Sequence, residues 1–167
     1  MAGIRNEYVE HLVKRKDPVY WRLLLAVAVI ATVFSLIFAL FNLFGILLFI
    51  AMTAVVYFVW LFSNVEYEYL YIDGEFSVDE VQNKTRRRKL VNVRQSDLII
   101  CGPENNDDVR YNMNGAAVMD VSGGCDQSRR YVYIFTGRGR KVAMLFEMTE
   151  ALKREIRYYT PQKFREY

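Results

Sequence analysis

The side chains that most often carry catalysis are sparse in this chain. General acid–base catalysis usually depends on histidine or on a carboxyl group with a shifted pKa in a pocket. The one histidine, His11, lies near the N-terminus, where we expect an ordinary surface residue. The pairs Asp79-Glu80 and Asp107-Asp108 are adjacent in sequence, so in extended backbone the two carboxylates of each pair point to opposite sides. We therefore predict no catalytic residues and no enzyme activity.

Metal and cofactor sites are not indicated either. Cys101 and Cys125 form no CxxC motif, and two thiols with one distant histidine cannot complete a four-ligand zinc site. The run 105–108, Asn-Asn-Asp-Asp, lacks the spacing of a calcium-binding loop. If both cysteines face the cytoplasm, its reducing conditions disfavour a disulfide between them. We expect no cofactor, and we expect the two cysteines to be small, semi-buried residues without a chemical role.

Positive charge gathers in two clusters. The first is Arg86, Arg87, Arg88 and Lys89. The second, at the ends of a predicted strand hairpin, is Arg129, Arg130, Arg138, Arg140 and Lys141. One interpretation is contact with anionic lipid or an acidic partner, worth about 1 kcal/mol per side chain near a membrane surface. The other is a solvated face on which these cations pair with carboxylates such as Glu75, Asp79 and Glu80.

The overall charge balance bears on the class of partner. Residues 65–167 hold 17 Lys and Arg against 16 Asp and Glu. Nucleic-acid affinity depends on neutralising phosphates, so this balance argues against a nucleic-acid-binding domain. Of the net charge of +3 at pH 7, residues 1–22 contribute +2, with a basic cluster at Lys14, Arg15 and Lys16.

Among the elements that position these residues, a long apolar stretch follows the charged N-terminal arm. Residues 23–65 contain no Asp, Glu, Lys or Arg, and a membrane span needs about 20 apolar residues. Asn42 and Gly45 favour a turn near the middle. The sequence predicts a transmembrane helical hairpin over 20–64, with helices at about 20–42 and 45–64. A cleaved signal peptide is disfavoured because its apolar region is only about 7–15 residues long.

The flanks of this hairpin predict its orientation. The basic cluster before the first helix and the uncharged connection between the helices place both termini in the cytoplasm of a multi-pass cell-membrane protein. Four aromatic residues are expected to form an interfacial belt at one membrane face: Tyr20, Trp21, Tyr57 and Trp60. Ion and proton transport normally requires ionisable residues within the bilayer. The hairpin offers none, which disfavours a channel or transporter.

The N-terminal arm, residues 1–19, shows a helical pattern. Ile4, Tyr8 and Leu12 recur at four-residue spacing, and Val9 and Val13 widen the apolar face. We predict an amphipathic helix over 3–16 that ends at Asp17-Pro18. It would lie on the cytoplasmic leaflet or pack on the soluble domain of the same chain, and the pattern favours neither.

Beyond residue 64 the period changes to alternation typical of strands. We predict seven strands, at 65–71, 75–82, 86–93, 97–101, 116–121, 130–135 and 141–147, with a polar loop over 102–115. Asp73-Gly74 is a tight hairpin signal. Thr149 is expected to cap a last helix, whose buried face carries Met148, Leu152, Ile156 and Tyr159. The soluble region, 65–167, is thus predicted to be a small antiparallel sandwich or open barrel closed by one helix.

This layout resembles bacterial membrane proteins with a pleckstrin-homology-like (PH-like) domain. The resemblance rests on the apolar hairpin, on EYEYLYIDGEFSVDEVQNKTRRRKLVNV (66–93) and on RKVAMLFEMTEALKREIRYYTP (140–161). The opening NEYVEHLVKRKDP (6–18) is similar to the start of an uncharacterised family of small Gram-positive membrane proteins. The resemblance implies a mainly-β fold of seven strands and a C-terminal helix, without a catalytic signature. It does not imply a ligand, because one fold hosts many functions.

Three functions remain open at this point. Phosphoinositide-binding members of the fold carry Lys and Arg around the first hairpin, whereas here that turn, Ile72-Asp73-Gly74-Glu75, is acidic. We therefore do not transfer that site. The first hypothesis is a membrane-anchored module that binds a protein or peptide at the cytoplasmic membrane surface, with an exposed strand edge as one candidate binding surface. The others are an accessory subunit that acts through its hairpin in a larger membrane complex, and a module that binds anionic lipid.

Overall fold

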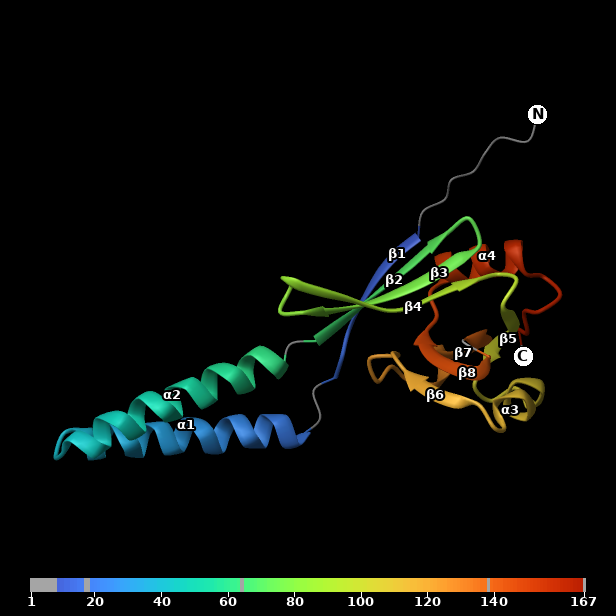
Figure 1. Ribbon diagram of the computed structural model, residues 1–167. Helices are drawn as coiled ribbons and strands as arrows, with labels where there is room; N and C mark the ends of the chain where they lie inside the picture. Colours follow the sequence, from blue (N-terminus) through green and yellow to red (C-terminus); the bar gives the residue numbers. More distant parts are fainter. Residues whose placement is uncertain (1–8, 17–18, 64, 138, 167) are drawn as a thin grey trace. The chain divides into compact units, whose positions relative to one another are not determined.

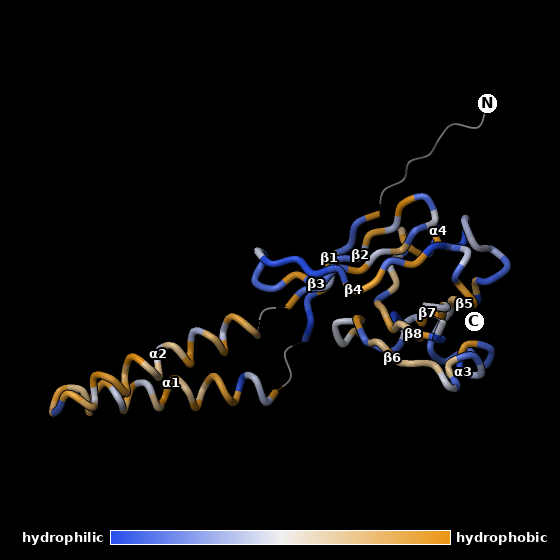
Figure 2. Tube along the Cα trace, viewed as in Figure 1, coloured by the Kyte–Doolittle hydropathy of each residue, from blue (hydrophilic) through white to orange (hydrophobic). Residues whose placement is uncertain are grey.

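The computed structural model describes residues 9–16, 19–63, 65–137 and 139–166, and it divides into two compact units. One unit, residues 16–65 and 82–86, contains a hairpin of two helices, α1 (Val19–Ala39) and α2 (Leu43–Ser63), which pack side by side (Figure 1). Each has 21 residues, about 30 Å of helix. Apolar residues surround both helices (Figure 2). Both are long and apolar enough to cross a membrane, which indicates membrane association and confirms the predicted pair of apolar helices.

The turn between the helices lies where the sequence predicts it. The Asn42 side chain accepts a hydrogen bond from the Gly45 amide, with 2.8 Å between Oδ1 and N. A Cβ atom at Gly45 would lie 2.4 Å from the carbonyl of Phe38. Glycine at this position therefore lets the start of α2 approach the end of α1.

The other unit holds two four-stranded sheets. The first sheet has the order β1-β2-β3-β4, with β1 (Val9–Lys14), β2 (Val65–Ile72), β3 (Glu75–Gln82) and β4 (Arg86–Arg94). The second has the order β5-β7-β8-β6, with β5 (Leu98–Pro103), β6 (Ala117–Asp120), β7 (Arg130–Gly137) and β8 (Arg140–Glu147). All seven predicted strands are present. The expectation of purely antiparallel pairing is wrong for β6, which runs parallel to β8.

The predicted helix over 3–16 is wrong for its described part. Val9–Lys14 forms β1, which pairs antiparallel with β2 from Val9 opposite Tyr71 to Lys14 opposite Glu66. Val9 and Val13 are four residues apart, and this spacing places them on one face of a strand as well as of a helix. Both are buried, and pairing with the edge of β2 decides between the two conformations. Ile4 and Tyr8 lie outside the described residues.

An aromatic core joins the two sheets. Tyr69, Tyr71 and Phe76 from the first sheet meet Tyr133 and Phe146 from the second, and all five side chains are fully buried. The centroid of the Phe76 ring lies 5.2 Å from that of Tyr133 and 5.3 Å from that of Phe146, with edge-to-face geometry. Such pairs add about 0.5–1.5 kcal/mol each to the free energy gained from burial. The alternation of β2 thus supplies the centre of the sandwich.

Two α-helices and one turn of 3-10 helix, η1 (Gln127–Arg129), complete the described part of this unit. In α4 (Glu150–Tyr159) the Thr149 side chain accepts a hydrogen bond from the Leu152 amide, which confirms the predicted cap. The predicted loop 102–115 contains a helix, α3 (Asp107–Met113). Asn106 caps α3 by accepting from the Val109 amide at 3.1 Å, and the acidic pair at 107–108 occupies its first turn, where negative charge is favourable. Val109 is buried in a cluster with Ile100, Val132, Ile134, Ala143 and Leu145.

Candidate functional site

A groove of about 620 Å³ runs between the two sheets, at the free edge of β4. Its walls come from β4, β6 and the paired ends of β7 and β8. The lining residues are Arg88, Lys89, Leu90, Val91, Asn92, Val93, Asp97, Met119, Phe135, Thr136, Gly137 and Val142. Apolar, cationic and polar side chains therefore line a hollow whose volume lies within the range of ligand pockets in other proteins.

The two predicted basic clusters contribute unequally to this groove. Arg88 and Lys89 line it directly. Arg140 and Lys141 pair with Gly137 and Thr136, which also line it. The structure therefore brings part of each cluster to one place, although more than forty residues of sequence separate them. Arg138 lies outside the described residues.

Several of these cations are available to a partner. Among the described residues, no carboxylate forms an ion pair with Arg86, Arg88, Lys89, Arg140 or Lys141. Arg86, Arg88, Lys89 and Arg140 are exposed, and Lys141 is half-buried. Against them the groove is lined by one carboxylate, Asp97. With Arg88 and Lys89 against Asp97, the described residues that line the groove carry a net positive charge.

Arg87 has a different role. Its Nη1 lies 2.9 Å from Oε2 of Glu68, a buried residue of β2. Burial and hydrogen bonding with the Glu10 carboxyl raise the pKa of Glu68, and the positive charge of Arg87 opposes that rise. In addition, Arg94 pairs with Glu75 at 3.1 Å. The salt-bridged alternative thus holds for Arg87, with Glu68 as its partner.

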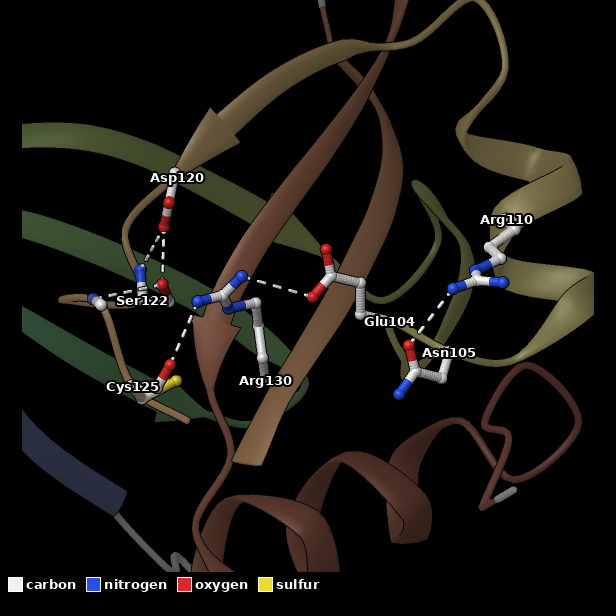
Figure 3. A network of polar contacts seen from close by, with 8 residues as sticks. Glu104, Asn105, Arg110, Asp120, Ser122, Cys125 and Arg130 are labelled. Atoms are coloured by element: carbon white, nitrogen blue, oxygen red, sulfur yellow. Dashed lines mark hydrogen bonds and ion pairs between the residues drawn. The ribbon is translucent and has the colours of Figure 1, made fainter. Parts of the chain in front are cut away.

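Arg129 and Arg130 lie at the far end of the β7–β8 pair, and Arg130 takes part in a polar network (Figure 3). Arg130 donates to the carbonyl of Cys125 at 3.1 Å and lies 3.5 Å from the Glu104 carboxylate. Arg129 pairs with Glu147 at 2.8 Å. In the same network Ser122 donates to Asp120 at 2.7 Å. Both arginines are thus held by carboxylates of the protein and stand apart from the groove.

The two cysteines are free and buried. Burial raises the pKa of both thiols, and Arg130 offsets part of that rise at Cys125. A raised pKa keeps a thiol protonated and a poor nucleophile. His11, predicted on a helix, lies instead in β1 opposite Tyr69.

The aromatic residues predicted as interfacial anchors lie at one end of the helical hairpin. Tyr20 and Trp21 begin α1, and Tyr57 and Trp60 belong to the last two turns of α2, which runs antiparallel to α1. Tyr20, Tyr57 and Trp60 are exposed. Their position in a membrane interface remains a prediction.

Sequence reasoning missed the apolar part of the groove. Leu90, Met119, Phe135 and Val142 come from four different strands, and the last two belong to continuous apolar runs, 131–135 and 142–146. A core residue and a groove residue look alike in such a pattern. Only the pairing of β6 beside β8 places Met119 opposite β4.

Comparison with known proteins identifies one family. The model of a family described as bacterial PH-like domain (DUF6106) matches residues 5–166. No curated protein and no solved structure gives a significant match. The family match spans the helical hairpin as well as both sheets.

Proposed function

Because the chain belongs to the bacterial PH-like domain family (DUF6106), we propose that it is a membrane-anchored, non-catalytic module that binds a protein or peptide at the cytoplasmic membrane surface. The observation that carries this proposal is the groove beside β4, with its apolar lining and unpaired cations at the entrance. The unit that bears it follows two helices able to span a membrane. A groove whose described lining residues form no set of catalytic groups supports a binding function better than an enzymatic one.

The proposed orientation rests on charge. Lys14, Arg15 and Lys16 precede α1, whereas the connection between the helices, residues 40–42, has no charged residue. Positive residues beside membrane helices are retained in the cytoplasm. Both termini, and with them the groove, would then face the cytoplasm.

An accessory subunit that acts through its hairpin is the second candidate. The observation in its favour is that the described helices expose apolar side chains along their whole length, for example Phe34, Leu47 and Ile50. These side chains could contact lipid or the helices of another membrane protein. The candidates differ in which unit the partner recognises.

Replacement of residues 19–63 by an unrelated two-helix hairpin separates the two. Partners would be crosslinked in intact cells and purified with the wild-type and the exchanged chain. Retention of the same partner by the exchanged chain supports recognition by the PH-like unit. Loss of that partner, with the PH-like unit still folded, supports the accessory subunit and contradicts our proposal.

The lipid-binding candidate needs a test on the full chain. Because β1 is an integral part of the first sheet, a fragment that starts at residue 66 would expose the edge of β2. The full-length protein in nanodiscs, mixed with anionic vesicles at rising salt, avoids this problem. Salt-sensitive vesicle binding through Arg88 and Lys89 would support lipid as the ligand.

A further inference from the structure

We propose that the groove binds an acidic segment in extended conformation, which adds as a further strand along the free edge of β4. This proposal rests on the proposed function, since it names the partner segment of the same groove. It concerns the mode of binding and the charge of the ligand.

The groove follows the edge of β4. Among the described strands, β4 pairs with β3 alone in the first sheet. Six consecutive residues, Arg88 to Val93, line the groove. Because side chains alternate between the two faces of a sheet, consecutive residues border one hollow only where it runs along the strand edge. That edge carries backbone N–H and C=O groups that a second strand can pair with.

The other edges of the described sheets offer less room. The Cys101 amide of β5 donates to the carbonyl of Lys163 at 2.8 Å, and the Arg165 amide donates to the carbonyl of Cys101 at 2.7 Å. The C-terminal segment thus occupies that edge. At the end of β1, Gly123 packs against Val13 and Lys14. β6 has four residues, whereas β4 has nine.

The dimensions and charges define the ligand. Six residues of strand span about 20 Å, and a hollow of about 620 Å³ holds several extended residues. Leu90, Met119 and Val142, which are half-buried, would contact apolar side chains, while Arg88 and Lys89 would pair with carboxylates. Asp97 lies past the other end of β4, so acidic side chains are expected toward Arg88.

A lipid headgroup explains fewer of these features. It would use the cations, but it would leave the unpaired backbone edge and the apolar lining without a partner. A peptide strand uses all three. We therefore assign the groove to an acidic peptide segment, and anionic lipid becomes an outcome of the test.

The test uses the full-length protein in nanodiscs of uncharged lipid and an eight-residue peptide of alternating valine and glutamate. Two further peptides carry N-methyl groups on the valines or on the glutamates, because each set of amides points to one edge of the extended peptide. A fourth peptide has lysine in place of glutamate. Binding is measured by fluorescence anisotropy, and exchange of the amides of residues 86–94 by mass spectrometry.

Strand addition predicts that the glutamate peptide binds, slows amide exchange in β4, and loses about tenfold or more in affinity in at least one N-methylated form. The lysine peptide is expected to bind at least about tenfold more weakly. The double variant Arg88→Glu/Lys89→Glu should show the same loss. Lys153→Glu/Arg154→Glu, which reverses the same two residue types on α4, should bind as the wild type does.

The proposal is overturned if the glutamate peptide does not bind, if both N-methylated peptides bind as well as the parent, or if the lysine peptide binds equally. Binding of anionic nanodiscs through Arg88 and Lys89, without peptide binding, would overturn it in favour of lipid. If the peptide proposal fails in any of these ways, the proposed function is still supported as long as the chain with the exchanged hairpin retains its partner. Loss of that partner would remove the proposed function even if the peptide binds β4.

Discussion

The hydroxyl groups of the buried tyrosines differ in what they contribute to the stability of the fold. The Tyr69 hydroxyl donates to the Val121 carbonyl at 2.6 Å and accepts from the Glu147 amide at 3.3 Å. The hydroxyls of Tyr71 and Tyr133 are buried without a hydrogen-bond partner among the described residues. Burial raises the pKa of all three tyrosines. The first hydroxyl joins the sheets, whereas the other two are buried at a cost.

We therefore predict that removing these hydroxyl groups has different effects on the free energy of unfolding. Tyr71→Phe and Tyr133→Phe should change the free energy of unfolding by less than about 0.5 kcal/mol or increase it, because no protein hydrogen bond is lost. Tyr69→Phe is the matched control and should lower it by about 1–3 kcal/mol, since it leaves the Glu147 amide unsatisfied. Thermal unfolding of the detergent-solubilised protein measures all three. Equal losses in the three variants would contradict this interpretation.

The carboxyl of Glu68 predicts a dependence of stability on pH. Its pKa is raised in the folded state, chiefly by burial and by the Glu10 carboxyl. The folded protein thus holds this proton more tightly than the unfolded chain does, so the contribution to stability is present at low pH and is lost as pH rises through the folded pKa.

Glu68→Gln, which cannot ionise, should consequently unfold at a higher temperature than the wild type at about pH 7. The advantage should shrink as pH falls toward about 4, near the ordinary pKa of glutamate. Glu10→Gln should also stabilise at neutral pH, because it removes the neighbouring carboxyl. A melting temperature of Glu68→Gln that is unchanged or lower at neutral pH would count against this account.

At the level of elements, the sequence predicts what depends on local pattern. Alternation in β2 and the Asp73-Gly74 turn, where both residues have positive φ, are enough to predict the first hairpin. Thr149 predicts the start of α4. These signals are contained within a few residues, so no tertiary contact is needed to read them.

What the sequence does not predict depends on distant partners. The spacing of Val9 and Val13 fits a helix and a strand equally, and pairing with β2 decides for β1. The pairing of β6 with β8 arises from a parallel contact between segments more than twenty residues apart. For the same reason the sequence shows that the basic residues are clustered, but it does not show which of them lie beside the groove. Nor does it show which of them form ion pairs with Glu68, Glu104 and Glu147.

The attachment of β1 can be tested at Gly123. This residue has φ +63°, and a Cβ atom there would lie 2.4 Å from Val13 Cγ1 and 2.8 Å from the Lys14 carbonyl oxygen. Gly115 has φ +74° with nothing within 4 Å, so Gly115→Ala carries only the backbone strain. We expect Gly123→Ala to lower the free energy of unfolding by about 1–3 kcal/mol more than Gly115→Ala. It should also speed amide exchange over residues 9–14, whereas equal effects of the two variants would exclude a tight contact with β1.

At the level of the whole molecule, the chain leaves the first sheet at β1, passes through both helices and returns as β2. These two strands are paired, with Lys14 opposite Glu66. The hairpin is therefore joined to the PH-like unit at two neighbouring points of one sheet.

Cysteine labelling of intact cells tests the proposed topology. Phe44→Cys lies at the hairpin turn and Asp126→Cys in the PH-like unit, and both native side chains are exposed. We expect a membrane-impermeant maleimide to label Phe44→Cys in intact cells and Asp126→Cys only after permeabilisation. The native cysteines are buried and supply little background. The reverse pattern would place the groove outside the cell.

The most direct test of the central claim is photo-crosslinking from the groove in living cells. A photoreactive phenylalanine analogue would replace Met119, which lines the groove, or Tyr158, which is exposed on α4. The account predicts a discrete protein adduct from position 119 that disappears in Arg88→Glu/Lys89→Glu and persists in Lys153→Glu/Arg154→Glu. An adduct that is insensitive to the first double variant, or that forms only from position 158, would contradict recognition through the groove beside β4.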